Sequence, residues 1–142
     1  MAIVELKMYR AKEISFFNKV ENGTKIEFEN KYSYNVSYGQ NNMCKGELSI
    51  SACAKEAPDK FGVKVIMEGV FRFDEGEKRE KIHVASFKEL FPYAKALIST
   101  VSANAGVPAI MVPAIDIEKQ SIYKYDYKNP FGKPDENNTD AE

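Results

Sequence analysis

Few side chains in this sequence have the type and spacing that catalysis requires. The one histidine, His83, could serve as a general base, and the two cysteines, Cys44 and Cys53, could serve as nucleophiles or metal ligands. His83 lies at the edge of a charged run, where we expect a solvated or capping side chain. The cysteines are nine residues apart, so on one regular strand they would face opposite ways and could not act together.

The remaining candidates for chemistry also favour structural roles. Cys44 falls on an apolar strand face, which is typical of core packing, and Cys53 falls on the polar face, where it could be a free thiol but has no neighbouring base. Glu27 and Glu29 share a polar face with lysines and are expected to be solvated. No glycine-rich phosphate loop and no Cys/His group with zinc spacing is present. We therefore predict a protein that is not an enzyme and that uses no metal and no cofactor.

The overall composition indicates a globular chain of one domain. Of its 142 residues, 44% are hydrophobic and 29% are charged, with 20 Lys+Arg against 21 Asp+Glu and a net charge of -1. This balance gives no reason to expect nucleic acid or an anionic membrane as a partner. No apolar run reaches membrane length, the N-terminal stretch lacks the long apolar core typical of a signal peptide, and the cysteines are few, so we expect a cytoplasmic location.

The first half of the sequence alternates apolar and polar residues with the period of antiparallel strands. The clearest alternation covers residues 25–38, with only Asn30 breaking the apolar row, and further strands are predicted at residues 43–55 and 61–73. Residues 4–17 alternate less cleanly, which predicts a bulge or a bend in that strand. Asn22 and Gly23 indicate a tight turn, and short turns throughout favour an antiparallel sheet of four strands.

The period changes to that of a helix after a charged loop at residues 74–81. Ser86 and Glu89 have the spacing of a capping box, which predicts one amphipathic helix from Ser86 to Asn104, with Gly106 as its stop signal. Pro92 predicts a kink or a later start. The fold class predicted is α+β: a four-stranded antiparallel sheet with one long helix and a short C-terminal helix on one face.

An apolar connector with two prolines follows the long helix. It reads Val-Pro-Ala-Ile-Met-Val-Pro-Ala-Ile-Asp-Ile over residues 107–117, and it must be covered by the sheet, by another subunit or by a bound partner. The short helix is predicted at residues 116–124. We predict one domain over residues 1–127 and a disordered polar tail over residues 128–142.

Several segments resemble the export chaperone SecB. Residues 90–95 (Leu-Phe-Pro-Tyr-Ala-Lys) and 97–102 are similar to the main helix of that family, residues 106–116 to its connector, and residues 12–16 and 65–71 to its strands. The resemblance implies a homodimer or homotetramer that holds unfolded or partly folded polypeptides in apolar grooves without ATP, with protein export as one role of the family. The family also includes dedicated chaperones of toxin–antitoxin pairs, so an antitoxin is the alternative partner.

The resemblance has departures at the surface that binds the SecA motor. Glu13 matches one acidic position of that surface, but Phe17 and Lys64 stand where further acids are expected. Capture of polypeptides is therefore better supported than docking to SecA.

The candidate polypeptide-binding residues are apolar side chains that suit contact with varied sequences. Met adapts its shape, and Tyr offers a large area with a polar tip. An alternative for the connector is that it only packs on its own sheet, and the two tyrosines could equally belong to the core. The candidates are Tyr32, Tyr34, Ile110, Met111, Val112 and Ile115.

Overall fold

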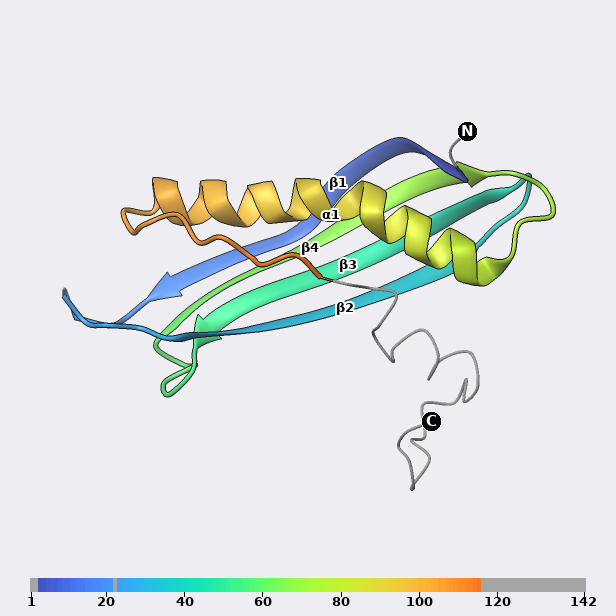
Figure 1. The fold of residues 1–142 in the computed structure, drawn as a ribbon. Coiled ribbons are helices and arrows are strands. Elements are labelled where there is room, and N and C mark those ends of the chain that lie inside the picture. The colour runs from blue at the N-terminus through green and yellow to red at the C-terminus, as the bar shows by residue number, and fades with distance from the viewer. Residues whose placement is uncertain (1–2, 22, 116–142) are drawn as a thin grey trace, which may run out of the picture.

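The structure is a computed structural model that describes residues 3–21 and 23–115. Four strands and one helix follow each other along the chain: β1 (Val4–Asn18), β2 (Phe28–Tyr38), β3 (Met43–Ala54), β4 (Phe61–Phe73) and α1 (Arg79–Asn104). The strands form one antiparallel sheet, and α1 lies across one face of it (Figure 1). The predicted α+β class, with four antiparallel strands and one long helix, is confirmed. The expected short helix and polar tail lie outside the described residues.

The strand order is β1-β4-β3-β2, so the first strand pairs with the last. Strands β2, β3 and β4 follow one another by short turns, as the sequence predicts. The connection from β1 to β2, residues 19–27, instead crosses the ends of β4 and β3, where Lys19 N donates to Lys60 O (2.6 Å) and Lys55 N donates to Glu27 O (2.7 Å). The expectation that only short turns join the strands is therefore wrong at this connection.

Strand β1 contains the irregularity that its sequence predicts. Its register against β4 shifts twice, between Leu6 and Met8 and again between Ala11 and Glu13. Each shift changes which residues face the helix, so Met8 and Arg10 point away from it although they are in phase with Val4. The structure thus explains why charged residues interrupt the apolar row of this strand.

The core lies between the sheet and α1. The inward positions of β3 and β4 alternate with period two, and Leu48, Ile50 and Val65 are inaccessible to water. They meet the buried stripe of α1, which includes Ile82, Leu90 and Ile98. In the part of the chain that the structure describes, no helix is long and apolar enough to cross a membrane.

Helix α1 begins earlier than the sequence predicts. It starts at Arg79, inside the expected charged loop, with Lys78 as N-cap and no side-chain capping bond, and it runs through Pro92. The predicted capping box is wrong because Ser86 is buried within the helix, where its hydroxyl accepts a hydrogen bond from Tyr34 (2.6 Å) and donates to His83 O (3.2 Å). The helix ends where predicted, and Gly106 takes the positive φ (92°) that turns the chain back.

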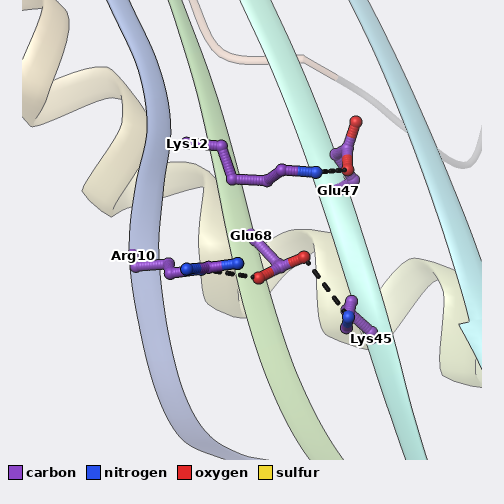
Figure 2. A network of polar contacts seen from close by, with 5 residues as sticks. All are labelled: Arg10, Lys12, Lys45, Glu47 and Glu68. Carbon is purple, nitrogen blue, oxygen red and sulfur yellow. Dashed lines mark hydrogen bonds and ion pairs between the residues drawn. The ribbon is translucent and has the colours of Figure 1, made fainter.

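The sheet face away from α1 carries a network of ion pairs (Figure 2). Arg10 Nε donates to Glu68 Oε1 at 2.9 Å, and Lys45 Nζ lies 3.5 Å from Glu68 Oε2. Lys12 Nζ pairs with Glu47 Oε1 at 2.9 Å. The hydrogen bond from Arg10 holds the pKa of Glu68 below its ordinary value of 4.5, and the Lys45 ammonium adds to this effect. Three cationic side chains, Arg10, Lys12 and Lys45, therefore surround the two carboxylates, so this part of the outer sheet face is not acidic.

Candidate functional site

The connector that follows α1 turns back and runs along the helix (Figure 1). Two helix serines hold it there. Ser102 Oγ accepts from Ile110 N (2.8 Å), Ser99 Oγ donates to Ile110 O (2.8 Å), and Ser102 O accepts from Val107 N (3.3 Å). Both backbone polar atoms of Ile110 are satisfied without secondary structure, so an extended segment with two prolines is stable against the helix.

The connector, held by these hydrogen bonds, presents alternate residues to opposite sides, as an extended chain does. Ile110 and Val112 are 7% and 1% exposed and belong to the core, whereas Met111 between them is 68% exposed. The Met111 sulfur lies 3.6 Å from Ser99 Oγ. Of the connector residues predicted to contact a client, Met111 alone projects freely into solvent, and Ile115 is half-buried against the core.

An apolar groove lies beside this segment, with a volume of about 560 Å³. Its three walls are the connector, the β1–β2 connection and the first residues of β2. Asn18, Glu21 and Thr24 form an exposed polar rim. Its main lining side chains are Val20, Ile26, Phe28, Asn30, Ile110 and Met111.

The two tyrosines proposed from the sequence do not line this groove. Tyr34 is 1% exposed, packs edge-on against Phe87 (ring centroids 5.4 Å apart) and is a core residue, which is the alternative that the sequence leaves open. Burial raises the pKa of Tyr34, so its hydroxyl stays protonated and donates to Ser86. Tyr32 is half-buried and packs on the core.

Some groove residues were missed because they come from the irregular β1–β2 connection. Val20 and Ile26 reach the groove through the crossover, which the sequence pattern does not reveal, and Phe28 beside them is the first residue of β2. Ser99 and Ser102 were missed as well, although two small polar residues one helical turn apart are a usable signal for a segment bonded to the helix. Asn30, which breaks the apolar row of β2, is also one of the residues that line the groove.

The candidates for chemistry are dispersed. His83 is buried in α1 beside the Tyr34 ring, with centroids 5.1 Å apart, so its expected solvated position is wrong. Burial raises the pKa of Cys44 to about 11, which keeps this thiol protonated and unreactive. Within residues 3–21 and 23–115, no group of three or more His, Cys, Asp or Glu side chains could hold a metal ion.

The residues considered for SecA docking lie on the outer face of the sheet. Glu13 is exposed next to the second register shift of β1 and pairs with Ile66. Phe17 covers Gly62, where an added Cβ would meet the Phe17 ring at 3.0 Å, and Lys64 follows on β4. One acid beside an aromatic side chain and a lysine does not make an acidic patch.

Comparisons with known proteins connect this geometry to a family and to a fold. No family model matches the sequence. The "Uncharacterized protein MJ0357" of Methanocaldococcus jannaschii is 33% identical over 118 residues, which cover 77% of this chain and 76% of that protein. A protein of unknown function from Streptococcus agalactiae aligns with a TM-score of 0.46 and 13% identity over 78% of this chain and 97% of its own.

A solved SecB-like chaperone has the same fold. The Mycobacterium tuberculosis Rv1957 SecB-like chaperone, in complex with a ChAD peptide from the Rv1956 HigA1 antitoxin, superposes with a TM-score of 0.65 at 10% identity. The match covers 80% of this chain and 90% of the chaperone chain, and it confirms the resemblance seen in the sequence at the level of the fold. The chain therefore belongs to the same family as MJ0357 of Methanocaldococcus jannaschii and has the fold of the SecB-like chaperones.

Proposed function

We propose that this protein is an ATP-independent chaperone that holds unfolded or partly folded polypeptides in the groove beside its connector. The observation that carries the proposal is Met111, which is 68% exposed although the residues on either side of it are buried. Met111 is the most exposed large apolar side chain among the described residues, and it lines an apolar groove rather than standing alone on the surface.

The physical properties of the groove suit an extended chain of varied sequence. Its volume of about 560 Å³ and its open rim accommodate several side chains at once. Met111 adapts to the shape of what it touches, and Phe28 offers a large flat area. Each apolar client side chain that is buried contributes about 1–3 kcal/mol, so a few contacts suffice for micromolar binding.

A dedicated chaperone for one partner is the second candidate. It is favoured by the SecB-like fold neighbour that holds an antitoxin peptide. Docking to SecA through Glu13, and with it a role in export, has less support because Phe17 and Lys64 occupy the neighbouring positions. Both candidates are non-enzymatic and use no cofactor.

Assembly into a homodimer or homotetramer in the cytoplasm belongs to the same proposal. Tyr9 on β1 stacks on Tyr93 of α1 (4.4 Å between centroids), and both rings are exposed, as is Ile14 further along β1. This apolar edge is suited to burial against a second copy. Sedimentation at micromolar concentration tests it, and a monomer would contradict it.

The test of the proposed function compares two methionines on opposite sides of the sheet. Met111→Ser removes the exposed groove side chain, and Met8→Ser removes a side chain that is 59% exposed on the outer face. We expect Met111→Ser to weaken suppression of aggregation of unrelated denatured proteins, measured without ATP, and Met8→Ser to leave it unchanged. Both changes leave the free energy of unfolding within about 0.5 kcal/mol of wild type because both side chains are exposed.

The outcomes separate the candidate functions. A general holdase protects several unrelated denatured proteins, whereas a dedicated chaperone protects none of them and yields one tight complex when it is purified from its own cells. Equal protection by Met111→Ser and wild type would place client binding elsewhere on the surface.

A further inference from the structure

Asn30 is a polar side chain in an apolar row. The inward positions of β2 are Phe28, Asn30, Tyr32, Tyr34, Val36 and Tyr38, and Asn30 lies opposite Ala52 of β3 in the register. Its residue is half-buried, but its carboxamide oxygen Oδ1 is out of contact with water. Among the described residues, no donor reaches this oxygen within hydrogen-bond distance.

An unsatisfied buried acceptor lowers the stability of the fold because the oxygen has lost water and gained no partner. An apolar side chain of similar size would pack against Ala52 without that loss. Asn30 is also a lining residue of the groove, together with Phe28 and Met111, so its oxygen is close to where a client would lie. The last side-chain torsion of Asn has a broad range of allowed angles, so a rotation about it can bring the carboxamide oxygen to the groove.

We infer that Asn30 accepts a hydrogen bond from a backbone N–H of an extended polypeptide segment lying in the groove. The inference rests on the proposed function and specifies what the groove recognises. A backbone N–H is the donor that nearly every residue of a client offers whatever its sequence, and the apolar walls formed by Val20, Ile26 and Phe28 disfavour a charged donor. A helical client has already used its N–H groups, so this contact selects chains that are extended.

The test uses a fluorescein-labelled ten-residue peptide that alternates Leu and Thr, and a series in which each backbone amide is N-methylated in turn. Binding to the full-length protein is followed by fluorescence anisotropy. For wild type we expect N-methylation at one or two positions to weaken binding about three- to tenfold. In Asn30→Leu those positions lose their extra sensitivity, while the unmethylated peptide binds more weakly by a similar factor.

Asn35→Leu is the matched control. Asn35 is an exposed asparagine on the same strand, and it faces the opposite side of the sheet, across from Glu47. We expect this variant to keep the wild-type N-methylation profile. Comparing wild type and variants at each peptide position also cancels the steric effect that N-methylation has by itself.

A stability measurement distinguishes recognition from a structural role. Because Asn30→Leu removes an unsatisfied acceptor, we expect it to raise the thermal midpoint by about 2–5 °C. A lower midpoint would mean that Asn30 bonds within the fold, and it would overturn the inference. Asn30→Val, with a smaller side chain suited to a strand, provides the same test if leucine does not fit.

Failure of the inference and failure of the proposed function give different results. If wild type binds none of the peptides, the proposed function fails. If wild type and Asn30→Leu bind the unmethylated peptide equally and share one N-methylation profile, Asn30 is not the acceptor, and the groove remains the client site.

Discussion

Tyr34 and Asn30 lie four residues apart on the same face of β2, but only Tyr34 finds a hydrogen-bond partner for its buried polar atom among the described residues. The Tyr34 hydroxyl is buried and donates to Ser86, which in turn donates to His83 O. The Asn30 oxygen is buried and accepts nothing from the described residues. The end of the sheet around Tyr34 is complete in itself, whereas the end around Asn30 has an open groove and a polar atom that lacks a partner.

This difference teaches that burial alone does not distinguish structural from functional polar residues. What distinguishes them is whether the fold supplies the hydrogen-bond partner. Around Tyr34 even the facing strand is adapted, because Gly46 of β3 leaves the space that the tyrosine ring fills. No comparable adaptation surrounds Asn30, whose register partner on β3 is the small residue Ala52.

The largest effect is expected from filling the space beside Tyr34. In Gly46→Ala the new Cβ would lie 2.8 Å from Tyr34 Cζ and closer still to its hydroxyl oxygen, so the ring or the strand must move. We expect unfolding by urea to show a loss of about 3 kcal/mol. Gly39→Ala, where the nearest atom is Met43 O at 3.7 Å, is the control and is expected to be nearly neutral.

Removing the acceptor of the Tyr34 hydroxyl tests how much this hydrogen bond stabilises the fold. Ser86→Ala leaves a buried hydroxyl without its acceptor, and we expect a loss of about 1–2 kcal/mol in the free energy of unfolding. Tyr34→Phe costs less, because Ser86 keeps His83 O as its acceptor. If Ser86→Ala stabilises the protein, as Asn30→Leu is expected to do, the contrast between the two ends of β2 disappears.

At the groove end of the sheet, the hydrogen bonds that Ser99 and Ser102 make with the connector can be tested in the same way. Ser102→Ala removes the acceptor of Ile110 N, and we expect a loss of about 1 kcal/mol, with hydrogen exchange at the Ile110 amide faster by about fivefold. Thr100→Ala, an exposed position on the same helix, is the control. Unchanged exchange at Ile110 would show that the prolines and the buried Val112 hold the connector without the serines.

The smallest effect concerns Glu68 on the outer face, where the polar partners Arg10 and Lys45 are exposed cations. Its folded pKa lies below its ordinary value of 4.5, so its ion pairs stabilise the fold fully above that pH and lose their effect as the pH falls through the folded pKa. The stability difference between wild type and Glu68→Gln is therefore expected to shrink between about pH 5 and pH 3, by less than about 1 kcal/mol. Glu5→Gln, in an exposed pair with Lys7, is the control for changes unrelated to this network.

The regular parts of the fold were predictable from the sequence because side-chain alternation reports directly on burial. The strand predicted at residues 61–73 coincides with β4, and the poor alternation of residues 4–17 correctly predicts an irregular strand. The start of α1 was not predictable from local pattern. Ser86 and Glu89 have capping-box spacing, but the partner of Ser86 is Tyr34, which is 52 residues away in the chain.

The candidate site could be predicted from the sequence only in part. The connector was identified because an apolar segment with two prolines must be covered by other parts of the protein or by a partner. All its apolar candidates were predicted to bind clients, although neighbouring residues of an extended chain face opposite sides. This alternation separates the exposed Met111 from the buried Val112. The opposite wall was beyond prediction, since the alternation of β1 and β2 does not reveal that residues 19–27 cross the end of the sheet.

The strand order has a consequence for how the chain folds. Strands β2, β3 and β4 are joined by short turns and can assemble from contacts local in sequence, which are fast to form. Strand β1 is synthesised first, yet Val4 pairs with Phe73 and Asn18 with Phe61, so it has no partner until β4 exists. A chain of this topology carries an unpaired strand through its own synthesis, and pulse-labelled hydrogen exchange is expected to find the amides of β1 protected last.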